Sequence, residues 1–145
     1  VKDILNQPNI STTTVQNLPT KEKVKRVVDG DTVELANGQI VRYVGVNAPN
    51  NGEPFEEEAT EANAKLVSGK TVTFEYDAYT SDRFGRVLAY PFVDGKNVVV
   101  EMARQGLAKV TIYQDRRKLK YQDDLLKAQE EAKKKKIGMW SATKN

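Results

Sequence analysis

The sequence predicts an α+β fold in which five β-strands form a small barrel and three helices pack around it. Two observations carry this prediction. Three short stretches with the two-residue period of strands follow one another over residues 23–46, with only tight turns between them. A helical segment, two more strands and two more helical segments follow. This order is typical of a closed or nearly closed barrel of the oligonucleotide/oligosaccharide-binding (OB) type.

The first three strands form a predicted meander. Residues 23–28 and 32–35 are rich in β-branched side chains and flank a turn over 29–31, where the Asp-Gly pair is common turn chemistry. Asn37-Gly38 is a strong hairpin signal. It leads into a third predicted strand over 39–46, so consecutive strands are expected to lie side by side.

A helix is predicted over 54–66, with Pro54 in its first turn and glutamates near the positive end of its dipole. The remaining predicted elements are strands over 71–76 and 86–93, a polar loop over 77–85, a helix over 98–105 capped by Asn97, an extended segment over 107–112 and a last helix over 120–136.

The amino-acid composition limits the catalytic groups and the metals that the protein can use. The chain has 145 residues, is 39% hydrophobic and 30% charged, and carries neither cysteine nor histidine. Disulfides, zinc–thiolate sites and histidine bases are therefore excluded. Any metal would be held by oxygen, which indicates calcium or magnesium. The net charge of +3 is unevenly placed, because cations concentrate over 116–136 and glutamates over 53–61. A basic flank suits a polyanion, although a lysine-rich helix is often only a solvated face.

The pattern indicates one domain over 21–145, preceded by a flexible tail over 1–20 that has no sustained period. No apolar run approaches the roughly 20 residues that span a bilayer. No signal peptide is visible in the chain.

Specific motifs then appear in a fixed order. They are VDGDTV at 28–33, VRYVGVNAP at 41–49, DRFGRVLAY at 82–90 and RQGLAKV at 104–110, with Trp140 near the end. Their order and spacing resemble the staphylococcal nuclease (thermonuclease) family over about residues 22–142. The resemblance implies an OB barrel and a phosphodiesterase that cuts DNA and RNA with one calcium ion.

The resemblance also implies a site. Asp31 matches the first carboxylate ligand of the metal, with Asn47 and Ala48 at the other metal positions. Arg42 and Arg86 match the arginines that grip the phosphate. Guanidinium groups and a divalent cation both stabilise the charge that develops on the equatorial oxygens during phosphodiester cleavage.

Two positions depart from the family pattern. Asn47 stands where active members carry a second metal carboxylate, and Asn50 stands where they carry the glutamate regarded as the general base. A neutral amide weakens a calcium site, and loss of a positioned base costs about 10²–10⁴ in rate. We therefore expect weak calcium binding and weak or lost cleavage. Glu53 could reach into the site instead, or it could cap the helix that follows.

A nucleotide-stacking rim is expected from Lys70, Arg83, Phe84 and Tyr113, because bases stack on aromatic rings. The family has a tyrosine where Phe84 stands, so the hydroxyl is lost while stacking is kept. Either arginine of the site could instead be held in a structural salt bridge.

Three hypotheses follow. The first is a monomeric domain that binds single-stranded DNA or RNA with little cleavage. The second is an active calcium-dependent nuclease with an altered site. The third is a scaffold or surface domain whose groove no longer binds nucleic acid. The family resemblance favours a secreted or cell-envelope location.

Overall fold

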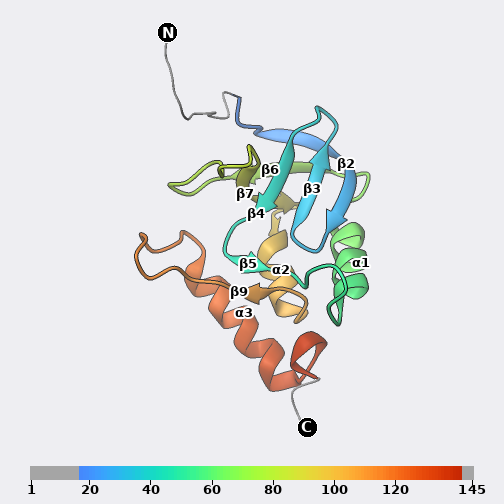
Figure 1. Ribbon diagram of the computed structural model, residues 1–145, viewed down its shortest axis with the longest axis vertical. Coiled ribbons are helices and arrows are strands. Elements are labelled where there is room, and N and C mark those ends of the chain that lie inside the picture. The colour runs from blue at the N-terminus through green and yellow to red at the C-terminus, as the bar shows by residue number, and fades with distance from the viewer. Residues whose placement is uncertain (1–16, 142–145) are drawn as a thin grey trace.

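Five strands close into the predicted barrel. They are β2 (Lys21–Asp29), β3 (Thr32–Leu35), β4 (Ile40–Tyr43), β6 (Thr71–Glu75) and β7 (Val87–Val93). The computed structural model describes residues 17–141, and Figure 1 shows the barrel in its upper half. Neighbours in the order β4-β3-β2-β6-β7 are antiparallel, and a parallel pairing of β4 with β7 closes the ring. The predicted α+β class and five-stranded OB-type barrel are confirmed.

The single strand predicted over 39–46 is wrong. The structure has two strands there, β4 and β5 (Val46–Asn47), separated by a turn. The break falls at Gly45, whose φ of 86° favours glycine and whose absent Cβ would meet Leu125 Cδ1 at 2.8 Å. Beyond the turn, β5 leaves the barrel and pairs with β9 (Lys109–Val110). This departure carries residue 47 out of the sheet to the barrel mouth.

Three helices pack outside the barrel, as predicted. They are α1 (Glu56–Val67), α2 (Val98–Arg104) and α3 (Gln122–Lys135). Asn97 caps α2 as expected, since its Oδ1 accepts from Val99 N at 2.9 Å. Pro54 is not in the first turn of α1, because Phe55 precedes that helix with a left-handed φ of 72°. The pattern also missed the short strand β8 (Lys96–Asn97) and the 3-10 turn η2 (Gly138–Trp140).

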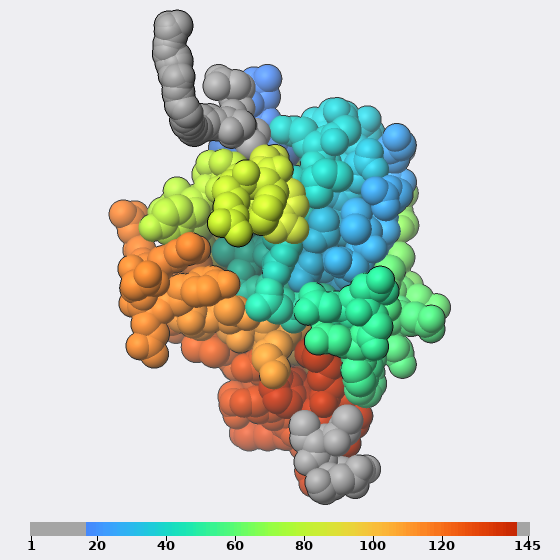
Figure 2. Space-filling model, in the orientation of Figure 1, coloured from blue at the N-terminus to red at the C-terminus, as the bar shows by residue number. Residues whose placement is uncertain are grey.

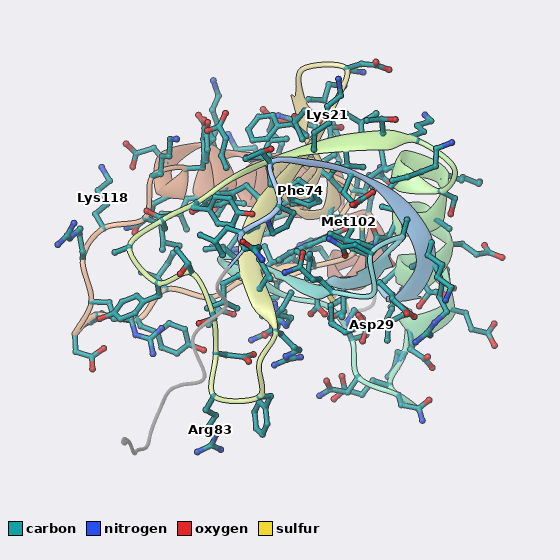
Figure 3. All side chains as sticks on the ribbon, turned by 90° about the horizontal axis from the view of Figure 1, so that it is seen from above. Lys21, Asp29, Phe74, Arg83, Met102 and Lys118 are labelled. Atoms are coloured by element: carbon teal, nitrogen blue, oxygen red, sulfur yellow. The ribbon has the colours of Figure 1, made fainter. Side chains whose placement is uncertain are left out.

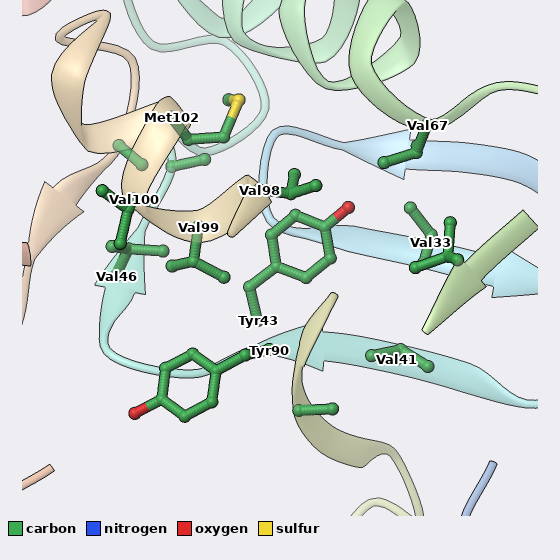
Figure 4. Packing of buried hydrophobic residues seen from close by; sticks show 14 of the residues in the cluster. Val33, Val41, Tyr43, Val46, Val67, Tyr90, Val98, Val99, Val100 and Met102 are labelled. Carbon is green, nitrogen blue, oxygen red and sulfur yellow. The ribbon is translucent and has the colours of Figure 1, made fainter. Parts of the chain in front are cut away.

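The core lies inside the barrel and beneath it, against α2 and α3. Figure 4 shows Tyr43 and Tyr90 among buried valines and Met102. Each of these tyrosines has a polar partner: Tyr43 donates to Asn63 Oδ1 at 2.7 Å and Tyr90 donates to Asp77. Burial raises the pKa of both phenols, so they remain neutral donors. The barrel interior is therefore filled with side chains, and ligands must bind outside it.

The chain before the barrel is tied to it from residue 17 onward. Leu18 packs against the core, the Pro19 carbonyl accepts from Tyr76 Oη, and the Thr20 carbonyl accepts from Phe74 N at 3.1 Å. The rest of the predicted tail, residues 1–16, lies outside the described residues. Within 17–141, no helix is long and apolar enough to cross a membrane.

Candidate nucleic-acid interface

A buried carboxylate, Asp31, lies at the barrel mouth and is only 6% exposed. The turn that carries it is held tightly, because a Cβ on Gly30 would approach the Cβ atoms of Ala48 and Ala59 to 2.7 and 2.8 Å. Asp31 Oδ1 accepts from Thr32 Oγ1 at 2.9 Å, and Oδ2 accepts from Ala48 N at 2.8 Å. Both carboxylate oxygens are therefore engaged within the protein.

A second carboxyl group lies behind Asp31. Asp29 Oδ1 accepts from Asp31 N at 3.0 Å, and the Asp29 carbonyl accepts from the buried Asn63 side chain at 2.8 Å. Burial, with a further contribution from the side chain of Asp31, raises the pKa of Asp29 to about 6, and the backbone N–H of Asp31 offsets part of this rise. The β2–β3 turn therefore places two interacting acids at one point, with Asp31 at the mouth and Asp29 behind it.

Arg42 projects from β4 across the mouth and holds it together. Its guanidinium lies 3.3 Å from Asp31 Oδ2 and donates to the carbonyls of Tyr43 at 2.6 Å and Val46 at 2.8 Å. It also donates to the side-chain oxygen of Asn47. These contacts join β4, β5 and the β2–β3 turn, so Arg42 has a structural role as well as a charge.

Asn47 is the link from the barrel mouth to β9. While its amide oxygen accepts from Arg42, its amide nitrogen donates to Thr111 Oγ1 at 2.9 Å. An amide can make this donor–acceptor bridge, whereas an ionised carboxylate only accepts hydrogen bonds. The asparagine is therefore integrated into the structure of this mouth.

Arg86 lies at the start of β7, where the long loop after β6 returns. Its Nε donates to Asp82 Oδ2 at 2.7 Å, and Asp82 Oδ1 accepts from the backbone of Phe84 and Arg86. The salt bridge considered from the sequence is thus present, and it orients the guanidinium. Phe84 is 70% exposed, between the Arg83 and Arg86 cations, and Figure 3 shows Arg83 at the loop tip.

A groove of about 200 Å³ runs between this loop and the loop that precedes α3. Its wall carries more cations than acids, because two aspartates, Asp77 and Asp82, line it beside five basic side chains. The basic side chains that line it are Arg42, Arg86, Arg116, Arg117 and Lys118.

One edge of the groove is an aromatic stack with a cation at its centre. The Arg116 guanidinium lies 4.8 Å from the ring centroid of Tyr79 and 4.7 Å from that of Tyr113. Both rings are more than half exposed, at 54% and 55%. These three residues, named the rim from here on, join two loops that are far apart in the sequence.

The structure brings most of the predicted site together. Arg42, Asn47, Arg86 and Tyr113 line the groove, with Asp31 and Ala48 beside Arg42. Arg83 and Phe84 lie on the loop at its edge. Asn50 is exposed in the turn before α1, and its backbone N–H donates to Glu53 Oε1 at 2.7 Å. This hydrogen bond holds the Glu53 side chain against the loop that precedes α1.

The residues observed at the rim differ from the stacking group predicted from the sequence, which was Lys70, Arg83, Phe84 and Tyr113. Lys70 does not line the groove, since it lies before the first residue of β6 and the groove lies beyond the last. Tyr79 and Arg116 belong to the rim but were not among the residues predicted from the sequence. The basic run after Tyr113 was a signal for Arg116, but nothing local marked Tyr79 in its polar loop.

The donors at the mouth are a poor fit for a tight calcium site. Calcium takes six to eight oxygens, and its affinity follows the number of charged ligands. Asp31 has both oxygens engaged, one of them beside a guanidinium, and the Asn47 oxygen already accepts from Arg42. Within residues 17–141, no group of three or more Asp, Glu, His or Cys could hold a metal.

Comparison with known proteins identifies the class to which this barrel and groove belong. The profile of the family described as staphylococcal nuclease homologue matches residues 40–142. The chain therefore belongs to the staphylococcal nuclease family, which confirms the resemblance of the four motifs.

Individual relatives agree with this assignment. A thermonuclease of Staphylococcus hyicus is 34% identical over 128 residues, which cover 82% of this chain and 75% of that protein. The SPbeta prophage-derived endonuclease YokF of Bacillus subtilis is 36% identical over 127 residues, and endonuclease YncB of the same organism is also 36% identical over 127. The matches to YokF and YncB each cover 80% of this chain, but only 42% of YokF and 59% of YncB.

Proposed function

We propose that this domain binds single-stranded nucleic acid in the groove and cleaves it slowly or not at all. The observation that carries the proposal is the set of guanidinium groups on one groove, from Arg42, Arg86 and Arg116, beside exposed tyrosine rings. Guanidinium groups recognise phosphate, and aromatic rings stack on bases at about 1–3 kcal/mol per base. A flexible single strand can offer both groups at once, whereas a stacked duplex cannot.

Slow cleavage follows from the side chains at the mouth. Asn50 cannot accept a proton from water, and the carboxylate of Glu53 accepts from the Asn50 backbone. Asn47 is neutral, so Asp31 is the carboxylate in contact with Arg42. Without a positioned base the rate falls by about 10²–10⁴. Calcium binding would be weak, and we assign no catalytic step to it.

Binding is tested with a fluorescent single-stranded oligonucleotide at several salt concentrations, with Arg86→Ala and the matched control Arg26→Ala. Arg26 on β2 pairs with Glu34 on β3 and does not line the groove. We expect affinity to fall with salt and to fall further in Arg86→Ala, with Arg26→Ala close to the natural chain. Salt-independent failure to bind would refute the proposal and favour the scaffold hypothesis.

A second candidate function is an active nuclease with an altered site. The observation in its favour is that the groove keeps Arg42 and Arg86, which can stabilise the charge of a phosphoryl transition state. Relatives at similar identity are named thermonuclease and endonuclease.

Digestion of single-stranded DNA and RNA, in calcium and in chelator, separates the two candidates. The natural chain is compared with the Asn47→Asp, Asn50→Glu double variant. Cleavage by the double variant alone supports a binding domain on a silenced nuclease site. Calcium-dependent cleavage by the natural chain supports the active nuclease instead, and then Glu53→Gln tests whether that side chain supplies the base.

A further inference from the structure

A second cationic surface lies below the groove, where β9 meets the carboxyl end of α3. Lys109 Nζ lies 5.8 Å from the centroid of the Trp140 ring, and Lys133 Nζ lies 4.9 Å from it. Both lysines are exposed. Two cations from distant parts of the sequence therefore meet over one aromatic ring. Lys109, Lys133 and Trp140 are named the lower patch.

Strand register connects the lower patch to the groove. Asn47 on β5 stands directly opposite Lys109 on β9. Side chains that are directly opposite in an antiparallel pair share a face, and so do residues two apart on one strand. Asn47 and Lys109 therefore lie on one face of the β5–β9 ribbon, while Val46 is buried on the other; Thr111, just beyond β9, contacts the Asn47 side chain.

The shared face begins beside Arg42, the arginine that spans the barrel mouth. Asn47 contacts Arg42 through one side-chain atom and Thr111 through the other, and all three residues line the groove. Lys109 is the next side chain along that face. Figure 1 shows β5 and β9 side by side, between the barrel and the lower end of α3. Hydrogen bonds join Arg42 to Asn47 and Asn47 to Thr111, and strand pairing places Lys109 opposite Asn47, so this face leads from the groove toward the lower patch.

The two ends of this path differ in what they offer a ligand. The groove has guanidinium groups and stacking rings, whereas the lower patch has two ammonium groups that act as point charges, one of which, Lys133, also pairs with Glu130 at 3.5 Å. Such groups bind the backbone of a strand whatever its bases are. A strand that leaves the groove along β9 would find phosphate contacts there.

We propose that nucleic acid bound in the groove continues across Asn47 and Thr111 to the lower patch, where Lys109 and Lys133 bind the following phosphates. This inference rests on the proposed function, since it concerns the same strand. It lengthens the binding site beyond the barrel mouth, and it makes Trp140 a reporter of the occupied path.

A flat anionic membrane fits this face less well. The first turn of α1, with Glu56, Glu57 and Glu58, flanks the β5–β9 ribbon in Figures 1 and 2. A broad negative surface would meet these acids together with the lysines. A narrow strand that follows the path avoids them, so nucleic acid is the ligand that the charge distribution favours.

The test compares two variants that lose the same charge. Lys109→Gln, Lys133→Gln removes the lower patch. Lys127→Gln, Lys134→Gln is the control, because those lysines lie on the face of α3 turned away from buried Leu125 and Ala132. Binding of oligothymidylates of about 4 and about 16 nucleotides, the range for single OB folds, is measured as a function of salt.

For the longer strand, we expect the patch variant to reduce the slope of log K against log salt by about 1.4, since each phosphate contact contributes about 0.7. The control variant and the 4-nucleotide strand should show little change. Because the chain has a single tryptophan, its emission should respond to the longer strand only. Thermal unfolding confirms that each variant is folded.

Equal slopes for the two variants, or an unchanged slope in the patch variant, would overturn the inference. If the natural chain binds neither strand, the proposed function itself fails. If Arg86→Ala weakens binding but the patch variant does not, only the extended path fails. Binding to vesicles that contain 30% phosphatidylserine is measured as well. If the patch variant loses vesicle binding but keeps the salt slope for the longer strand, the surface is assigned to lipid instead.

Discussion

The barrel mouth and the rim each place an arginine at their centre, but one arginine is mostly buried and the other is exposed. At the mouth, Arg42 and Asp31 are mostly buried, and their polar atoms are satisfied by neighbouring backbone and side chains. At the rim, Arg116 is exposed and lies between two exposed tyrosine rings. Its charge therefore stays in contact with solvent.

This difference separates stability from binding. A buried charge that loses its partner is costly, whereas an exposed stacked cation can exchange its partner for a ligand. The mouth is therefore expected to maintain the geometry of the groove, and the rim is expected to respond to nucleic acid. The following changes test this separation.

The largest effect is expected from Arg42→Met, which leaves Asp31 buried without its cation. We expect a loss of about 3–5 kcal/mol in the free energy of unfolding, measured by urea denaturation. Arg26→Met is the control, because that arginine is exposed and its pair with Glu34 contributes about 0–1 kcal/mol. Equal losses in the two variants would show that the mouth is not a structural centre.

A smaller effect, on binding alone, is expected at the rim. Tyr113→Leu should weaken single-strand binding by about 1–3 kcal/mol, the contribution of one stacked base. Its free energy of unfolding should change by less than about 0.5 kcal/mol. Tyr113→Phe keeps the ring and should bind like the natural chain. A loss of stability without a loss of affinity would reverse the assignment of this residue.

The dependence of stability on pH tests the acids behind the mouth. The folded protein raises the pKa of Asp29 from 3.8 to about 6, chiefly by burial. Between these values the folded state holds the proton more tightly than the unfolded state, so stability falls as pH rises through this window. Asp29→Asn removes that titration. Its stability relative to the natural chain should therefore be greater at pH 7 than at pH 4 in urea titrations, and a constant difference would contradict this expectation.

The smallest effect is expected at Lys70, which lies away from the groove at the opposite end of β6. Lys70→Gln should leave the affinity for a short single strand within a factor of about two, because it alters only the distant field. If its loss matched that of Arg86→Ala, the bound strand would have to take a path other than this groove.

Much of the fold could be predicted from local chemistry. Residue alternation, the Asn37-Gly38 hairpin and the Asn97 cap each act over a few residues, so the strand order and α2 followed from them. The end of β4 could not be predicted this way. The break at Gly45 depends on Leu125, which lies far along the chain on α3 and occupies the space that a side chain would need.

The site, like the fold, could be predicted only in part from local sequence. The motifs identified Asp31, Arg42 and Arg86, and the structure places them at one end of the barrel. Tyr79 gave no local signal, since a tyrosine in a polar loop is unremarkable until Arg116 and Tyr113 lie beside it. The link between Asn47 and Lys109 also depends on a pairing of two short strands that no local pattern marks.

The sequence by itself determined the family, the barrel and the chemistry excluded by the absence of histidine and cysteine. These properties depend on residue identity and on short-range periodicity. Tertiary structure decided which groups are engaged and which are available: the state of Asp31, the bridging role of Asn47 and the stack at the rim. Each depends on contacts between residues distant in sequence, because burial and pairing are set only when the chain has folded.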